Sequence, residues 1–254
     1  MAEVEIKNEN LVYAKPKLIT DNVMHYCPGC SHGTVHKLIA EVIEEMGFAE
    51  KTVGVSPVGC SVFAYNYIDI DWIEAAHGRA LAVATAVKRL YPGNLVFTYQ
   101  GDGDAYNIGL AETLNAAYRN ENICVFTVNN GNFGMTGGQM SWTTMPGQVT
   151  ATSPMGRDTD LTGIPIKVPE LVAYSFTPAY VARGAVTSPA EINKLKGYIK
   201  NAFEAQLNHE GYSLVEVMCS CPTNWGMDAI AAKKRLVDEV IPYYQLGEIK
   251  KRGE

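Results

Sequence analysis

The chain has 254 residues, 47% of them hydrophobic, and a formal net charge of −6. This length can bury one full core, so we expect a single domain over residues 1–254. An acidic chain without long basic blocks is not typical of nucleic-acid-binding proteins, and we expect the basic residues 250–252 to be a solvated tail.

The sequence also disfavours a secreted protein and a membrane-spanning protein. Residues 1–18 contain acidic side chains where a signal peptide has a basic start and an apolar run. No apolar stretch reaches the roughly 20 residues that span a bilayer. We therefore expect a cytoplasmic protein without membrane contact. In such a chain, six cysteines favour metal or redox chemistry over structural disulfides.

The first predicted elements alternate between helix and strand. Residues 1–26 are expected to form an extended lead-in that ends in a Cys-Pro-Gly-Cys turn. Apolar residues at helical spacing predict a helix from 35 to 46, closed by a glycine. A short buried strand is predicted over 52–55, and a helix over 77–90 ends before Pro-Gly.

The sequence pattern in the middle of the chain indicates a βαβ unit. A strand is predicted over 95–99 and runs directly into Gly-Asp-Gly. A helix over 105–119 follows, and then a strand over 123–128 that runs into Asn-Asn. This order and these lengths indicate a parallel sheet. We therefore expect an α/β fold with a mostly parallel sheet and helices on both faces.

The last third completes this fold. Residues 139–170 are rich in Thr, Pro, Gly and Met and show no clear period. A loop of this length in a compact domain is usually functional, so we expect it to cover a site. A helix over about 188–208 and a strand over 213–218 are predicted next. That strand leads to Cys219 and Cys221.

Polar residues follow two of the predicted strands, where parallel sheets bind their ligands. Asp102 offers a carboxylate, Asn130 an amide oxygen and Asn132 a backbone carbonyl. Such oxygens suit a hard cation, and diphosphate binding needs one. Gly101 and Gly103 let backbone N–H groups approach phosphate. A lone Gly-Asp-Gly is usually a plain turn, but the strand context favours a Mg²⁺–diphosphate site.

The cysteines suggest a second site. Cys27 and Cys30 form a CxxC turn at a helix start, Cys60 lies in a Gly-Cys-Ser turn, and Cys221 precedes a proline. Four thiolates can hold either a [4Fe–4S] cluster or a zinc ion. A zinc ribbon normally has two CxxC pairs, so the single pair favours the cluster. Cys124, in the middle of a predicted strand, is expected to be a core residue.

Taken together, these motifs resemble the beta subunit of the 2-oxoacid:ferredoxin oxidoreductases. The matching segments are CPGC at 27–30, VGCS at 58–61, HGRA at 77–80, GDGD at 101–104, NNGNFGMTGGQ at 129–139 and CPTN at 221–224. The resemblance covers most of the chain and weakens between about 150 and 210. It implies a thiamine diphosphate-binding fold.

The resemblance also assigns site residues. It implies Mg²⁺ ligands at Asp102, Asn130 and the carbonyl of Asn132. The cluster ligands would be Cys27, Cys30, Cys60 and Cys221, with Cys221 preferred over Cys219 because CPTN carries the match. The thiamine diphosphate contacts would be Val58, Gly59, Cys60, Ser61, His77, Gly78, Arg79, Ala80, Gly103, Asp104, Gly134, Met135, Thr136, Gly137, Gly138 and Gln139.

The implied reaction is oxidative decarboxylation of a 2-oxoacid to acyl-CoA and CO₂. Electrons would pass through the iron–sulfur cluster to ferredoxin, and coenzyme A would take the acyl group. An alpha subunit would supply the activating glutamate, for which this chain offers no candidate, and gamma and delta subunits are further expected partners.

The substrate is predicted from two positions. Members of the family that act on 2-oxoglutarate often carry a cation at the positions of Phe63 and Gly137, where this chain has a ring and a bare backbone. This favours a branched-chain 2-oxoacid such as 2-oxoisovalerate. The alternatives are 2-oxoglutarate or pyruvate as main substrate, a non-oxidative thiamine diphosphate decarboxylase, and a structural zinc- or cluster-bearing subunit.

Overall fold

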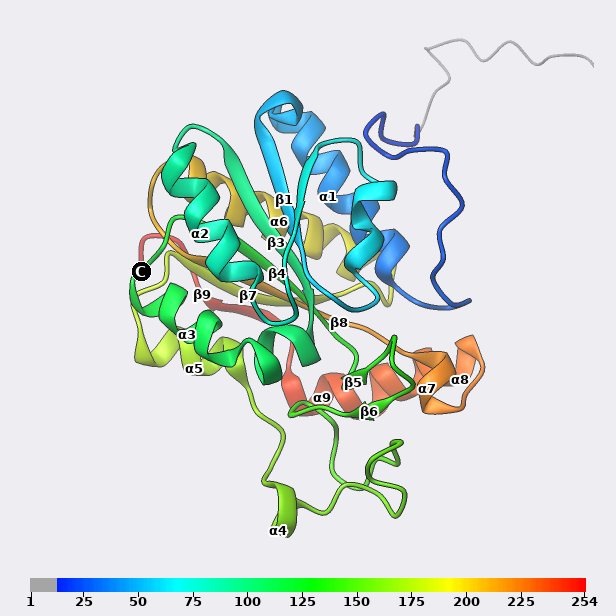
Figure 1. Ribbon diagram of the computed structural model, residues 1–254. Coiled ribbons are helices and arrows are strands. Elements are labelled where there is room, and N and C mark those ends of the chain that lie inside the picture. The colour runs from blue at the N-terminus through cyan, green and yellow to red at the C-terminus, as the bar shows by residue number, and fades with distance from the viewer. Residues whose placement is uncertain (1–12) are drawn as a thin grey trace, which may run out of the picture.

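A computed structural model describes residues 13–254, so the first twelve residues of the predicted lead-in lie outside it. At its centre is a seven-stranded sheet of order β2-β1-β3-β4-β8-β7-β9 (Figure 1). The strands are β1 Thr52–Ser56, β2 Asp71–Glu74, β3 Leu95–Gly101, β4 Cys124–Asn129, β7 Tyr180–Ala185, β8 Ser213–Met218 and β9 Gly247–Lys250. All neighbouring strands pair in parallel except β7 and β9. The predicted, mostly parallel sheet is confirmed.

Helices cover both faces of this sheet, as predicted (Figure 1). The longer ones are α1 His32–Met46, α2 Ala80–Leu90, α3 Leu110–Tyr118, α5 Val168–Ser175 and α6 Pro189–Leu207. Residues of α1 and α6 share one core cluster with the sheet, and residues of α2, α3 and α5 share the other. In the first cluster, the rings of Phe97, Phe126 and Phe203 pack edge to face with centroids 5.2–5.9 Å apart.

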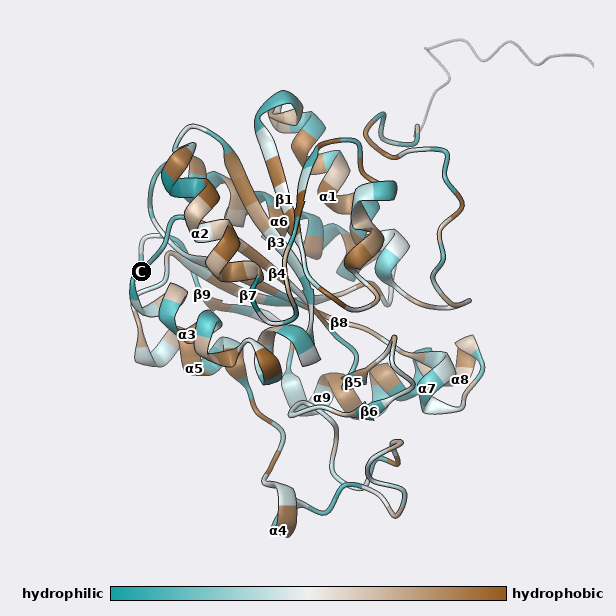
Figure 2. Ribbon diagram, in the orientation of Figure 1, coloured by the Kyte–Doolittle hydropathy of each residue, from teal (hydrophilic) through white to brown (hydrophobic). Residues whose placement is uncertain are grey.

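The strands of the sheet centre are buried on both sides, because helices cover both faces. They appear as an apolar band in Figure 2. Since β1, β3, β4, β7 and β8 run in parallel, their carboxyl ends share one edge. Within residues 13–254, no helix is long and apolar enough to cross a membrane.

Shorter elements gather near that edge (Figure 1). They are the ribbon of β5 Asn132–Phe133 and β6 Gln139–Met140, and the helices α4 Thr159–Thr162, α7 Pro222–Trp225, α8 Ala229–Arg235 and α9 Ile241–Tyr244. The segment that carries α4 leaves the body of the protein. Its side chains Met155 and Leu161 are 95% and 84% exposed.

Two predicted helices begin later than expected. The helix predicted over 77–90 begins at Ala80, because Gly78 adopts a left-handed backbone (φ 75°) and donates its N–H to Asp104. The helix predicted over 105–119 is divided into a π-helical turn, Gly103–Ile108, and α3. Gly109 separates the two, and a Cβ there would lie 2.6 Å from the carbonyl oxygen of Gly78.

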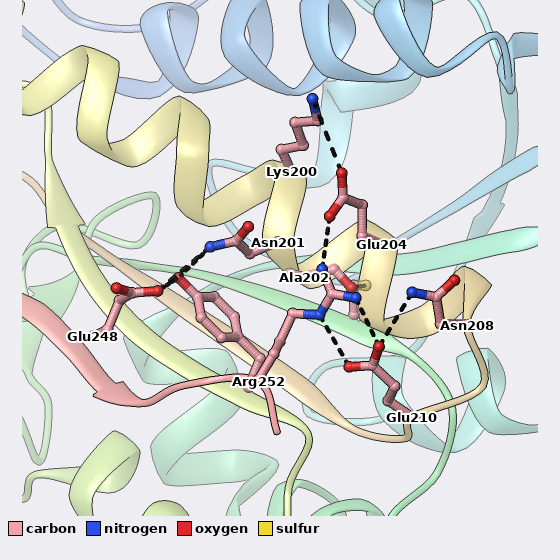
Figure 3. Close-up of polar contacts among 10 residues, drawn as sticks. Lys200, Asn201, Ala202, Glu204, Asn208, Glu210, Glu248 and Arg252 are labelled. Carbon is pink, nitrogen blue, oxygen red and sulfur yellow. Dashed lines mark hydrogen bonds and ion pairs between the residues drawn. The ribbon is translucent and has the colours of Figure 1, made fainter. Parts of the chain in front are cut away.

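Several helices and strands of the structure were not predicted. The aperiodic region 139–170 contains α4 and the start of α5, and β2, β7 and the elements after Cys221 were not predicted. The prediction that residues 250–252 form a solvated tail is wrong. Lys250 ends β9, and Arg252 forms ion pairs with Glu204 (2.6 Å) and Glu210 (2.7 Å), as Figure 3 shows.

Candidate cofactor site

A cleft lies at the carboxyl edge of the sheet. It is lined by His32, Val58, Gly59, Cys60, Ser61, His77, Gly101, Asp102, Gly103, Asp104, Asn130, Asn132, Phe133, Gly134, Met135 and Thr136. The segments after β1, β3 and β4 therefore meet here, as the sequence predicted for ligands of a parallel sheet.

Asp102 lies directly after β3 with its side chain almost completely buried. The hydroxyls of Ser141 (2.6 Å) and Thr143 donate to its Oδ2, and the N–H of Asn130 lies 3.4 Å from its Oδ1. Burial raises the pKa of Asp102 to about 6, and the two hydroxyls oppose this rise. A cation at this position would favour the carboxylate, so Asp102 fits a metal ligand.

The loop after β4 is held from several sides. The N–H of Gly131 donates to the side chain of Asn129 at 3.1 Å, and the hydroxyl of Thr144 donates to the carbonyl of Gly131 at 2.6 Å. The N–H of Asn132 donates to Oδ1 of Asn130 at 3.1 Å. These bonds keep Asn130 and Asn132 beside Asp102, and all three residues line the cleft, where their oxygen atoms would suit Mg²⁺.

The turn after Asp102 allows a close approach to backbone. A Cβ on Gly103 would lie 2.6 Å from the ring of Phe133, so this position accepts no side chain. The turn is a π-helical one, of a kind often found at functional sites. Gly101 and Gly103 both line the cleft, where their backbone would approach a diphosphate beside the proposed metal ligands.

Asp104 does not present its carboxylate to a ligand. Its Oδ1 accepts from Nδ1 of His77 and from the N–H of Gly78 (2.6 Å), and its Oδ2 accepts from Nε2 of Gln100 (2.6 Å). This buried network fixes the ring of His77, which is partly exposed to the cleft. A phosphate contact of Asp104 would have to come from its backbone.

The four predicted cluster cysteines lie near one another. Cys60 lines the cleft, Cys27 is exposed, and Cys30 and Cys221 are half-buried. Burial and the neighbouring thiols raise the pKa of Cys30 to about 11 and that of Cys60 to about 12. Neighbouring thiolates repel one another and a bound metal centre would offset this repulsion, so the four thiols suit a cluster.

The arrangement of the four cysteines differs from that of a site for one metal ion. In the part of the chain that is described, no three His, Cys, Asp or Glu side chains are placed to hold one metal ion. A four-iron cluster is held at its corners with one thiolate per iron, so it does not require such convergence. Cys124 is fully buried in β4, as predicted, and Cys219 is also buried.

Some predicted contacts lie outside the cleft. The residues that do not line it are Phe63, Gly78, Arg79, Ala80, Gly137, Gly138 and Gln139. Arg79 instead pairs with Glu112 at 2.7 Å, and the ring of Phe63 packs against His25 with a centroid distance of 5.1 Å. Gly137 is exposed, with open space around it.

His32, which was not among the predicted site residues, lines the cleft. It is the first residue of α1, and its Nδ1 lies 2.7 Å from the hydroxyl of Tyr99. Burial lowers its pKa to about 3, so the ring is neutral. Its position two residues after Cys30 was the only signal in the sequence.

Comparisons with known proteins agree with this geometry. The family model "Thiamine pyrophosphate enzyme, C-terminal TPP binding domain" matches residues 57–217. The ketoisovalerate oxidoreductase subunit VorA of Methanothermobacter marburgensis is 48% identical over 85% of this chain, which spans 45% of that relative's length. The 2-oxoglutarate synthase subunit KorB of Archaeoglobus fulgidus is 37% identical, over 78% of this chain and 70% of its own length.

The fold of the chain is also similar to that of a solved structure. A solved structure of 2-oxoglutarate:ferredoxin oxidoreductase from Magnetococcus marinus superposes with a TM-score of 0.75 at 24% identity, over 97% of this chain and 88% of the matched one. The family match and the KorB relative together identify the family. The chain belongs to the beta-type, thiamine diphosphate-binding subunits of the 2-oxoacid:ferredoxin oxidoreductases.

Proposed function

We propose that this chain is the cofactor-binding subunit of an enzyme that oxidises a branched-chain 2-oxoacid, such as 2-oxoisovalerate, to acyl-CoA and CO₂. Ferredoxin would accept the electrons. The observation that carries the proposal is that Asp102, Asn130, Asn132 and Cys60 line one cleft. This juxtaposition suits decarboxylation coupled to electron removal, whereas a non-oxidative decarboxylase needs no cysteines there.

Each group has a role in this proposal. Asp102, Asn130 and the carbonyl of Asn132 would hold Mg²⁺, and the backbone of Gly103 would approach the diphosphate. Bound thiamine diphosphate supplies the electron sink that allows a 2-oxoacid to lose CO₂. The four cysteines Cys27, Cys30, Cys60 and Cys221 would hold a [4Fe–4S] cluster, which accepts electrons singly.

The preference for a branched aliphatic substrate rests on charge. The described residues that line the cleft include no lysine or arginine. Arg79, the nearest cation in the matching motifs, is paired with Glu112 and turned to the carbonyl of Ile108. A second carboxylate on the substrate would be costly to bury without a cation. The 48% identity to a ketoisovalerate oxidoreductase subunit supports the same choice.

The partners are proposed on the same basis. The chain spans less than half the length of the VorA relatives, which carry a further stretch of sequence. The described residues that line the cleft include no glutamate. We infer that an alpha subunit supplies the activating glutamate, that gamma and delta subunits complete the complex, and that coenzyme A takes the acyl group.

The test is kcat/KM of the assembled complex with ferredoxin on 2-oxoisovalerate, pyruvate and 2-oxoglutarate. We expect 2-oxoisovalerate to be preferred, with product formation dependent on coenzyme A and on the electron acceptor. A preference for 2-oxoglutarate would contradict the substrate assignment. Turnover without an electron acceptor would instead indicate the non-oxidative alternative.

A further inference from the structure

The short helix α7 connects the cysteine segment to the metal loop. It begins directly after Cys221, which is its N-cap residue. Two consecutive side chains of α7 then donate hydrogen bonds to the loop of residues 130–134. Nε1 of Trp225 donates to the carbonyl of Asn130 at 3.1 Å, and Nδ2 of Asn224 donates to the carbonyl of Gly134 at 2.8 Å.

The same amide of Asn224 also faces the cysteine. Its Nδ2 lies 3.4 Å from Sγ of Cys221 and 3.4 Å from Oδ1 of Asn132. A carbonyl oxygen and a thiolate accept hydrogen bonds but cannot donate them, so the NH₂ group must point this way. The two N–H bonds of one amide can therefore serve Gly134 and Cys221 at the same time.

Other contacts fix this arrangement. Gly138 makes room for the amide, since a Cβ at Gly138 would lie 2.9 Å from that of Asn224. Asn132, whose side chain is buried, donates its own Nδ2 to the carbonyl of Asn130 at 3.2 Å.

We propose that Asn224 is a positioning residue that couples the two cofactor sites: one side-chain amide holds the metal loop and donates to the Cys221 thiolate. The proposal rests on the proposed function, because it requires that both groups bind. With a cluster bound, the amide of Asn224 would donate to a cluster ligand at Cys221 and hold the loop that carries Asn130 and Asn132, so the two sites would share one positioning residue.

This role predicts two separate effects. Hydrogen bonds to the sulfurs of a cluster stabilise its reduced, more negative state, so removing one lowers the reduction potential. Loss of a group that orients a metal ligand weakens metal binding by roughly tenfold or more. A change at Asn224 should lower the potential and also weaken metal binding. Loss of the Trp225 contact to Asn130 should weaken metal binding alone.

The experiment compares Asn224→Ala, Asn224→Asp and Trp225→Phe in the assembled complex. Asn224→Asp keeps the shape of the side chain but replaces the donor with a carboxylate, so it is informative even if the alanine variant folds poorly. Redox titration followed by electron paramagnetic resonance gives the cluster potential. Titration calorimetry with thiamine diphosphate and Mg²⁺ gives the affinity. A matched control is Asn115→Ala, which removes an amide donor in α3 that serves only the carbonyl of Ala111.

We expect both Asn224 variants to lower the cluster potential and to weaken thiamine diphosphate binding about tenfold, with Asn224→Asp the stronger. Trp225→Phe should weaken binding and leave the potential unchanged, and Asn115→Ala should change neither. Wild-type values for both quantities in Asn224→Asp would overturn the coupling. A wild-type complex without iron or thiamine diphosphate would contradict the proposed function itself.

Discussion

The burial of Asp102, a proposed metal ligand, opposes the charge that such a ligand must carry. Its carboxylate is 1% exposed, and burial raises its pKa to about 6. The hydroxyls of Ser141 and Thr143 stabilise the charge only in part. An ion at the site would remove the conflict, because a dication favours the ionised form of its ligand.

We therefore predict that Asp102→Ala loses thiamine diphosphate and Mg²⁺ binding while the fold remains. The variant removes the only negatively charged residue among the three proposed ligands. Thiamine diphosphate retained after gel filtration measures binding, and circular dichroism measures the fold. Asp69→Ala, at an exposed position, is the control and should retain the cofactor. Normal retention by the folded Asp102 variant would disprove the assignment.

The cysteines allow a comparison within one chain. Cys60 faces the cleft, whereas Cys124 is buried in β4 beside the carbonyl of Ala202. Cys60→Ser should abolish the visible absorption of the cluster in the anaerobic complex, and Cys124→Ser should preserve it. Equal absorption in the two variants would show that Cys60 is not a ligand.

The candidate site was predictable where single residues have a distinctive chemistry. Asp102, Asn130 and Cys60 follow strands and belong to recognisable motifs, and all three line the cleft. Ser141 and Thr143 could not be recognised, because hydroxyl residues are common in loops and only folding brings them to Asp102. The role of Asn224 depends in the same way on the approach of α7 to a loop about ninety residues earlier.

Among the secondary-structure elements, β7 shows why the sequence pattern can fail to indicate a strand. Its sequence YVARGA places a charged residue in the middle of a fully buried strand. Arg183 is balanced there by Glu216, by two 2.7 Å bonds to Glu170 and by backbone carbonyls of the C-terminal segment. Only the tertiary structure supplies these partners, and the apolar run that indicates a strand is interrupted.

This network makes Arg183→Leu a severe test of the fold. The substitution would leave Glu216, which is 1% exposed, buried without its cation. We expect a loss of roughly 3–5 kcal/mol in the free energy of unfolding, measured with urea. Arg119→Leu is the control, because the Arg119 side chain is 44% exposed and its partner Glu121 keeps a second ion pair with Arg89, so the loss should be less than about 1 kcal/mol. A similar, small loss in both variants would contradict this account of β7.

Several elements were predicted well. The helices α1 and α6 and the strands β1, β3, β4 and β8 agree with prediction to within a few residues. The helix starts that moved lie at Gly78 and Gly109, where backbone approaches backbone across the cleft edge. Such contacts join residues about thirty positions apart, so local periodicity does not contain them.

At the scale of the whole molecule, the parallel sheet brings both proposed cofactor sites to one edge. The turns after β1, β3 and β4 contribute Cys60, Asp102 and Asn130, and the segment after β8 adds Cys221. The segment that carries α4 extends beyond this edge (Figure 1), and its side chains Val149, Met155, Leu161 and Ile164 are exposed.

We propose that this one chain holds both thiamine diphosphate and an iron–sulfur cluster. The metal and thiamine diphosphate content of the complex purified without oxygen tests this proposal. We predict about four iron atoms, one Mg²⁺ and one thiamine diphosphate for each copy of this chain. Stoichiometric zinc without iron, or iron without thiamine diphosphate, would contradict the account.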